Sequence, residues 1–337
     1  MRLIKNLLII LVSATFFISS NQSMAAEATE LRLAQQFGVG YLPFLVMQKQ
    51  SLIEKYAQKN GLDNVKISWI QLGGGASMND ALLSNNLDFA AAGIPVFLSL
   101  WSKTKGESKV RVAAGLNNIP VFLNTANPNI RSLKDFTNKD KIALPAVKVS
   151  LQAIVLQMAA AKEWGNENYS KLDNLTVSMK HPDGMIALLS GKSEITAHFT
   201  TPPYMFQELE NPKIKLVINS ADLLGQHNFN VVYTTNKFRE ANPRLYKSFI
   251  EALDESMKII NSDKKAAGRI YIDLASLKGD QVDLIDKIVV DPRIEFTSTP
   301  NGLMKFANFM HQIGRIDSKP ATWQELCFPE AAMKSGS

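Results

Sequence analysis

Apolar residues recur along this chain with two alternating spacings. A two-residue period at 31–36 and 65–70 predicts strands, and a helical period predicts a helix over 45–59 between them. The pattern continues with a helix, a strand and a helix at residues 76–83, 88–92 and 95–101. Such alternation predicts a largely parallel, doubly wound α/β sheet.

A second series of the same kind follows two apolar stretches at 110–116 and 120–124. Its expected strands lie at 142–144, 175–179, 194–197, 216–218 and 230–234, and its expected helices at 149–163 and 184–189. A long amphipathic helix over 244–260 then returns to the first series. We therefore expect two α/β lobes linked by two crossing strands: a first lobe from residues 27–117 and 235–337, and an inserted second lobe from 118–234.

One sequence pattern occurs twice along the chain. Leu82–Ala91 (LLSNNLDFAA) is echoed by Leu188–Ala197 (LLSGKSEITA), and both copies read as a helix end, a polar turn, an acidic residue and a short strand. Two similar units are expected to face each other across a cleft. This arrangement indicates a protein that binds a small molecule.

The N-terminus has the layout of a secretory signal peptide. Arg2 and Lys5 precede an apolar run at 7–18, and small residues follow at 23–26. The run of about 12 residues is shorter than the roughly 20 that span a bilayer. We expect residues 1–26 to be cleaved and the mature protein to be periplasmic, with two domains in its 337-residue chain.

Composition excludes several classes of function. The net charge of +6 comes from scattered Lys and Arg residues, whereas a nucleic-acid binder needs a basic face. The single cysteine, Cys327, makes no internal disulfide and rules out cysteine-rich metal sites. His181, His227 and His311 lack metal-ligand spacing, so we expect neither a metal nor a cofactor.

The residues around the first copy of the echo resemble a known family. Gly74-Gly75-Ala76-Ser77, Ala81–Ser84, Leu87–Ala90 and Gly93 look like the signature of the substrate-binding proteins of nitrate/sulfonate/taurine-type ABC importers. The resemblance implies a type II periplasmic-binding-protein fold whose lobes close on a ligand by hinge motion. It also implies delivery of that ligand to a permease and its ATPase.

The first lobe offers candidate ligand contacts where strands lead into helices. Gly74, Gly75, Ala76 and Ser77 open a helix whose free N–H groups favour an oxyanion. A tight turn with Ser77 capping its own helix is the alternative. The other candidates in this lobe are Gly38 and Tyr41 after the first strand, and Gly93 and Pro95 after the third.

The second lobe offers a matching set. Lys148 and Ser150 lie at the start of a long helix, so two helix N-termini would make the cleft electropositive. His198 is expected just after the echoed strand, with Tyr204 beside it. Asn117 and Asn228 are candidate polar contacts near the crossing strands.

We expect a monomeric, non-enzymatic solute-binding protein that carries a small anion such as a sulfonate. No arginine clamp is predicted, which leaves a neutral or heteroaromatic ligand open. A lyase-like enzyme on the same scaffold would need a general acid or base, for which His198 is the candidate. A sensory module that presents its ligand to a receptor is a third alternative.

Overall fold

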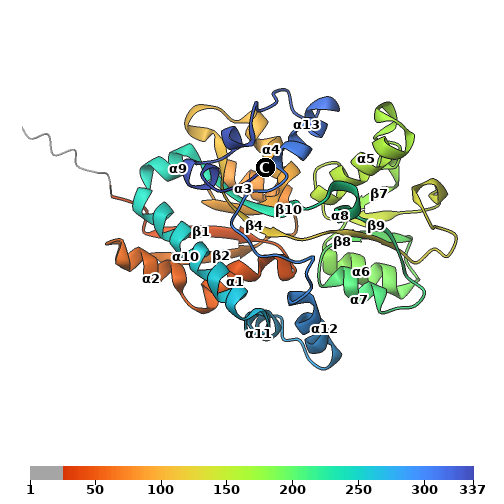
Figure 1. Ribbon diagram of the computed structural model, residues 1–337, viewed down its shortest axis with the longest axis horizontal. Helices are drawn as coiled ribbons and strands as arrows, with labels where there is room; N and C mark the ends of the chain where they lie inside the picture. The colour runs from red at the N-terminus through yellow and green to blue at the C-terminus, as the bar shows by residue number, and fades with distance from the viewer. Residues whose placement is uncertain (1–25) are drawn as a thin grey trace, which may run out of the picture.

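The computed structural model describes residues 26–337, so the predicted signal peptide lies outside the described residues except for Ala26. Two lobes, each with its own five-stranded sheet, lie side by side (Figure 1). The first sheet has the order β2-β1-β3-β10-β4. Its strands are β1 Glu30–Gln35, β2 Lys66–Gln71, β3 Phe89–Gly93, β4 Val110–Asn118 and β10 Asn228–Thr235.

The second sheet repeats the first one. Its order is β7-β6-β8-β5-β9, and in each sheet three parallel strands are followed by an antiparallel strand and an edge strand. Its strands are β5 Phe122–Thr125, β6 Ile142–Leu144, β7 Thr176–Ser178, β8 Ala197–Thr200 and β9 Lys215–Asn219. The expected α/β fold class with two lobes is confirmed, and the echoed segments occupy equivalent places, leading into β3 and β8.

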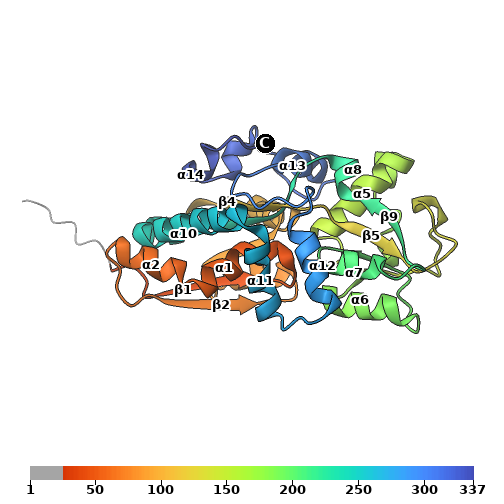
Figure 2. The ribbon, with the colours of Figure 1, turned by 60° about the horizontal axis from the view of Figure 1, so that its bottom comes forward.

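Helices cover both sheets (Figure 2). The first lobe carries α1 Leu42–Lys49, α2 Leu52–Lys59, α3 Gly75–Leu83, α4 Ile94–Lys103, α9 Asn236–Ala241, α10 Pro243–Ser262, α11 Lys264–Leu274, α12 Asp280–Val289, α13 Leu303–Gln312 and α14 Pro329–Ala332. The second lobe carries α5 Leu151–Trp164, α6 His181–Ser190, α7 Tyr204–Leu209 and α8 Ser220–Leu224. Phe89 of β3 stacks on Phe249 of α10 with ring centroids 4.0 Å apart, which fixes the longest helix on the first sheet.

Three elements differ from the sequence-based expectation. The helix expected over 45–59 is two helices, because Ser51 adopts a left-handed conformation with φ 47°. The strand expected at 194–197 is β8, so His198 lies inside a strand and not after it. Residues 228–234, which we expected in the second lobe, belong to β10 of the first sheet, because β10 pairs with both β3 and β4.

A third segment, residues 295–301, pairs with β4 and β10, the two strands that cross between the lobes. Glu295 bridges to Asn118 at the end of β4, and Gly115 N donates to Ser298 O at 2.9 Å. A Cβ at position 115 would lie 2.4 Å from Thr299 O, so only glycine permits this close approach. Beyond this segment, Arg293 lies over the rings of two second-lobe residues, Phe122 and Phe206.

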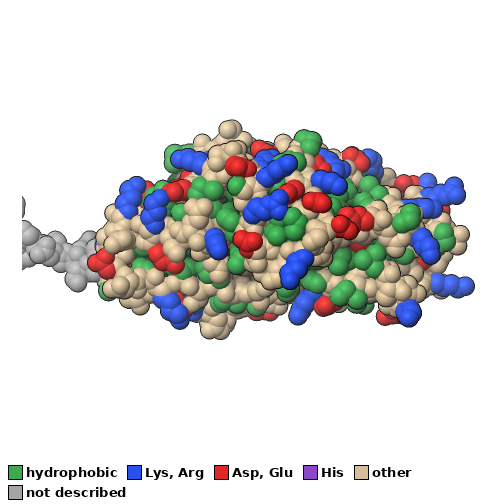
Figure 3. Space-filling view, turned by 90° about the horizontal axis from the view of Figure 1, so that it is seen from below, with side chains coloured by type: hydrophobic (Ala, Val, Ile, Leu, Met, Phe, Trp, Pro, Cys, Tyr) green, Lys and Arg blue, Asp and Glu red, His purple; other side chains and the backbone are tan. Residues whose placement is uncertain are grey.

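The surface carries mixed charge. Lys and Arg side chains alternate with Asp and Glu on the face seen in Figure 3. No helix within 26–337 has the length and apolar character needed to cross a bilayer. In the same range, no cluster of three His, Cys, Asp or Glu side chains is arranged to hold a metal ion.

The acidic residue of the first echo copy holds two strands together. The Asp88 carboxylate, 6% exposed, accepts hydrogen bonds from Arg32 N at 2.7 Å, Nε at 3.0 Å and Nη2 at 2.7 Å. These bonds tie the start of β3 to β1. In the second copy, the equivalent acidic residue, Glu194, is exposed.

We therefore predict that Asp88→Ala lowers the free energy of unfolding by about 2 kcal/mol, because it leaves the Arg32 donors without their charged partner. The matched variant Glu194→Ala should stay within about 0.5 kcal/mol of the parent. Urea denaturation of the two variants measures the difference. Equal effects at both sites would show that the Arg32 contacts contribute nothing.

Candidate functional site

Four helices begin where the two lobes meet. The carboxyl ends of β2 and β3 lead into α3 and α4, and those of β6 and β7 lead into α5 and α6. In open α/β sheets, the space beyond these strand ends is where ligands bind. Here the two sets of strand ends face each other across the junction of the lobes.

A small cavity lies at this junction, and we call it the interlobe pocket. Its lining comes from both lobes: Gln36, Gly75, Gly93, Val96, Pro145, Ser150, Leu151, Gln152, His181, Phe229 and Asn230. Its volume is about 10 Å³, which is close to the space of one water molecule. Any larger ligand requires the lobes to move apart.

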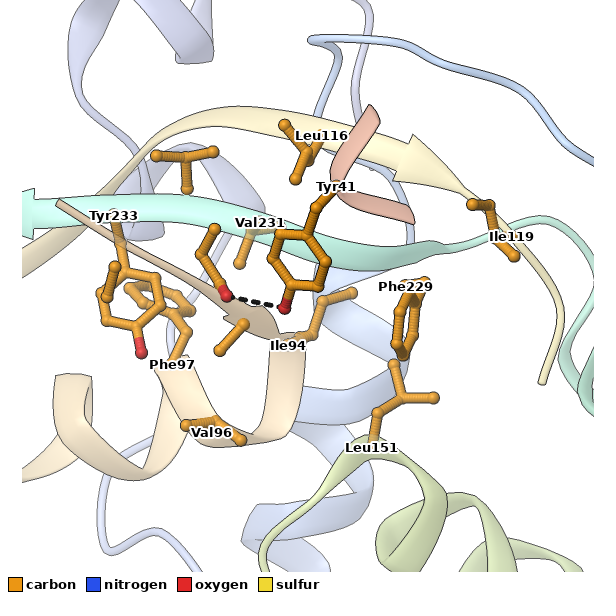
Figure 4. Close-up of a cluster of buried hydrophobic side chains, with 14 of the residues drawn as sticks. Tyr41, Ile94, Val96, Phe97, Leu116, Ile119, Leu151, Phe229, Val231 and Tyr233 are labelled. Carbon is orange, nitrogen blue, oxygen red and sulfur yellow. Dashed lines mark hydrogen bonds between the residues drawn. The ribbon is translucent and has the colours of Figure 1, made fainter. Parts of the chain in front are cut away.

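The lobes touch closely around this pocket. Figure 4 shows Leu151, from α5 of the second lobe, against Phe229 and Ile94 of the first. Val39 N donates to Pro202 O at 3.1 Å, also across the lobes. A Cβ at Gly93 would lie 2.9 Å from Leu151 Cβ, so the glycine permits the lobes to meet.

The polar groups of the interlobe pocket are neutral amides and an imidazole. Asn230 is 1% exposed, and neither its Nδ2 nor its Oδ1 has a hydrogen-bond partner within residues 26–337. Gln152 is 2% exposed, and its Nε2 lies 3.5 Å from His181 Nε2. A buried amide without partners is costly, which marks Asn230 as a group available to a ligand.

No Lys, Arg, Asp or Glu side chain lines the pocket among the described residues. Positive potential comes instead from the helix N-termini: Gly75 opens α3, Gly93 caps α4, Leu151 opens α5 and His181 opens α6. At α3, α4 and α6 no side chain caps the terminal N–H groups. Such ends attract negative charge.

His181 is held neutral. Burial lowers its pKa well below the ordinary value, and the nearby His198 ring lowers it further. His181 Nδ1 lies 2.9 Å from Thr200 Oγ1, and its ring stacks on Tyr204 with centroids 5.9 Å apart. The imidazole therefore acts at this site as a neutral hydrogen-bonding group.

Three of the residues predicted from the sequence line the interlobe pocket: Gly75, Gly93 and Ser150. Ser150 also caps α5, its Oγ accepting from Ala153 N at 3.2 Å.

Gly38, Tyr41 and Tyr204 line a second cavity beside it, of about 500 Å³, which we call the lateral pocket. The complete lining of the lateral pocket is Gln35, Gln36, Phe37, Gly38, Tyr41, Leu45, Gln48, Trp69, Gln71, Tyr204, Tyr271, Leu274 and Ala275.

Eight other predicted residues line neither pocket, and five of them lie at or near the starts of α3, α4 and α5. Gly74 packs near Pro145 O, and Pro95 is buried in α4. Ala76 and Ser77 are exposed, because the first turn of α3 presents them to solvent. Lys148 is exposed as well, in a left-handed turn with φ 64°.

Asn117 and Asn228 have structural partners at the junction of the lobes. Asn117 Nδ2 donates to Gly40 O at 2.6 Å. Asn228 Nδ2 donates to Asn118 Oδ1 at 2.7 Å, and Asn228 Oδ1 accepts from Asn301 N at 2.7 Å. Both side chains hold the crossing strands and do not reach either pocket.

His198 lies behind the pocket wall. As a residue inside β8 it points into the second lobe, where its Nδ1 lies 2.5 Å from Glu208 Oε1, and both side chains are fully buried. Glu208 Oε2 also accepts from Asn124 Nδ2 at 2.9 Å. Gly184 of α6 covers the other ring nitrogen. His198 reaches the junction only through its neighbour His181.

The polar residues that converge most closely were not among those predicted from the sequence. Gln36 directly follows β1, and His181 opens the helix after β7, so the strand-end rule that selected Gly75 applies to both. Gln152 lies two residues beyond Ser150. Asn230 carried no such signal, because it lies within β10 and reaches the pocket through its pairing with Gly93.

The architecture is that of the periplasmic binding proteins. The alkanesulfonate-binding protein SsuA of Xanthomonas axonopodis pv. citri, solved bound to MOPS, is 15% identical with a TM-score of 0.67, over 87% of this chain and 96% of that one. The aliphatic sulphonate binding protein SsuA of Escherichia coli is 16% identical with a TM-score of 0.64, over 92% and 100%. The nitrate-binding protein NrtA of Synechocystis PCC 6803 is 14% identical with a TM-score of 0.65, over 88% and 83%.

The chain belongs to the NMT1-like family, whose model matches residues 24–275. No curated protein matches it in sequence. The expected relationship to the substrate-binding proteins of sulfonate and nitrate importers is confirmed by the family and the structural neighbours together.

The contact at Gly93 generates a prediction about the motion of the lobes. In Gly93→Ala the added Cβ meets Leu151, so we expect fewer molecules with the lobes in contact. In the matched variant Gly74→Ala the new Cβ would lie 3.5 Å from Pro145 O, an ordinary contact, and the distribution should not change.

Spin labels at two exposed positions, Asp80→Cys in α3 and Asp183→Cys in α6, measure the distance between lobes. The single native cysteine, Cys327, is 3% exposed and should not react. The same distance distribution in both glycine variants would contradict the role of Gly93.

The lowered pKa of His181 generates a prediction for stability. Its ordinary pKa of about 6.5 applies in the unfolded chain, so below that pH the unfolded state binds a proton that the folded state does not. The parent should therefore lose up to about 2 kcal/mol more than His181→Gln between pH 7.5 and pH 5. Denaturant unfolding at several pH values measures this. Parallel pH profiles would mean that His181 is protonated in the folded protein.

Proposed function

We propose that this protein is the periplasmic solute-binding component of an ABC importer, and that it captures a small anion and delivers it as a monomer to a membrane permease. It performs no reaction itself under this proposal. The observation that carries it is the convergence of four helix N-termini and the unpaired amide of Asn230 on one pocket between two lobes.

The chemistry of the interlobe pocket favours an anion that is bound without a positively charged side chain. Each helix N-terminus contributes about 0.3–1 kcal/mol toward a negative group, so four supply about 1–4 kcal/mol. The amides of Asn230, Gln152 and Gln36 can supply hydrogen bonds, and no carboxylate among the described residues lines the pocket to repel the ligand. The absence of a charged partner also makes release of the anion easier, because no salt bridge has to be broken when the lobes open.

Family membership and fold support the transport role. The two SsuA proteins named above bind sulfonates, NrtA binds nitrate, and SsuA of Escherichia coli and NrtA are periplasmic; this chain spans 96%, 100% and 83% of their lengths. The signal-peptide pattern of residues 1–26 agrees with the same compartment. The enzyme alternative gains no support, because His198 faces Glu208 inside the second lobe and lines neither pocket.

The test separates charge from shape. Methanesulfonate and methanesulfonamide have nearly the same size, and only the first is an anion. We expect methanesulfonate, or another small anion such as nitrate or acetate, to raise the melting temperature, and the sulfonamide to leave it unchanged. Isothermal titration then measures the affinity. A response to the sulfonamide alone would contradict an anionic ligand.

Asn230 provides the matched mutational test. Asn230→Leu should weaken anion binding about tenfold or more while leaving the melting temperature equal or higher, because the buried amide has no partner to lose. The neighbouring Asn117→Leu should lower the melting temperature, because its amide donates to Gly40 O. Unchanged affinity in Asn230→Leu would remove the observation on which the proposal rests.

A further inference from the structure

The lateral pocket differs from the interlobe pocket in size and chemistry. Its volume of about 500 Å³ lies within the range of small-molecule sites, whereas the interlobe pocket has about 10 Å³. Its walls contain five aromatic side chains: Phe37, Tyr41, Trp69, Tyr204 and Tyr271. A cavity of about 150 Å³ holds a benzene ring, so the lateral pocket has room for a ring with substituents.

Four glutamines supply the polar part of the lining: Gln35, Gln36, Gln48 and Gln71. Gln35 is only 9% exposed, and its Oε1 has no hydrogen-bond partner in the described part of the chain. None of the 13 lining residues is charged. Aromatic faces together with amide groups fit an uncharged ring that carries a hydrogen-bonding substituent.

The lateral pocket is built mainly on one lobe. Every lining residue except Tyr204 comes from the first lobe, from β1, β2, α1, α11 and the segments that adjoin them. The pocket therefore keeps most of its shape when the lobes separate. Tyr204, at the start of α7, covers it from the second lobe when they meet, and burial raises the pKa of Tyr204 to about 12, so that its hydroxyl stays protonated.

The two pockets are neighbours. Gln36 lines both of them, and Tyr204 of the lateral pocket stacks on His181 of the interlobe pocket. A single molecule can therefore place one group in each. The helix N-termini serve the anionic group, and the aromatic walls serve a larger uncharged part.

We propose that the lateral pocket binds the aromatic ring of a solute whose anionic group occupies the interlobe pocket, so that the preferred ligands are aryl sulfonates or aryl carboxylates. This proposal rests on the proposed function for its anionic part. Closure of the second lobe brings Tyr204 onto the ring, which links recognition of the ring to the contact between lobes.

The experiment compares 4-hydroxybenzenesulfonate with methanesulfonate by isothermal titration. The parent should bind the ring-bearing anion at least about tenfold more tightly, because the ring is removed from water against aromatic walls. Ala275→Phe fills the lateral pocket and should abolish this advantage without changing the affinity for methanesulfonate. Ala266→Phe, at an exposed position outside the lining in α11, the helix that Ala275 caps, is the matched control and should behave like the parent.

Fluorescence of Trp69 reports on the lateral pocket directly. 4-Hydroxybenzenesulfonate, and benzamide as a ring without a negative group, should change the emission of the parent, and Trp69→Phe should remove the response. Methanesulfonate should leave the Trp69 emission nearly unchanged.

The outcomes separate the two proposals. Equal affinities for the two sulfonates, or a ring advantage that survives in Ala275→Phe, would overturn the lateral-pocket proposal while methanesulfonate binding still supported the proposed function. Failure of both sulfonates and of the other small anions would overturn the proposed function and the link between the pockets. If benzamide still changed the Trp69 emission in that case, the lateral pocket would bind rings but no anionic group.

Discussion

The pairing of β4 with β10 orients everything else in the molecule. These strands carry the chain out of the first lobe and back into it, and their buried amides satisfy one another: Asn228 Nδ2 donates to Asn117 O at 3.1 Å and to Asn118 Oδ1 at 2.7 Å. The segment around Glu295 and Ser298 adds hydrogen bonds along β4. The side-chain amides of Asn117, Asn118 and Asn228 are all paired, which holds the two strands together where the chain passes between the lobes.

The same topology explains why the echoed segments diverged in chemistry. In the first copy Asp88 binds Arg32 and anchors a strand, whereas in the second copy Glu194 is exposed. The strand after the first copy ends at Gly93, which lets the lobes meet. The strand after the second copy contains His198, whose partner is the buried Glu208. Equivalent strands, β3 and β8, thus serve contact between the lobes in one case and internal packing of a lobe in the other.

The two pockets at the junction of the lobes have different kinds of surface. The interlobe pocket has helix ends and neutral polar side chains, and its volume of about 10 Å³ admits a ligand only when the lobes part. The lateral pocket has aromatic faces, glutamine amides and room for a ring. Gln36 borders both pockets, so the two kinds of surface adjoin at one residue.

The two α/β lobes, nearly all strands and the loop at Gly75 could be predicted from the sequence, because hydrophobic periods and glycine turns are local signals. It misplaced β10 and His198, because strand partners and a shift of three residues along a strand depend on distant neighbours. Only the tertiary structure brought Asn230, Gln152 and His181 together, since they come from three separate elements in two lobes. These residues meet only because the two lobes pack against each other, and no local sequence pattern predicts that contact.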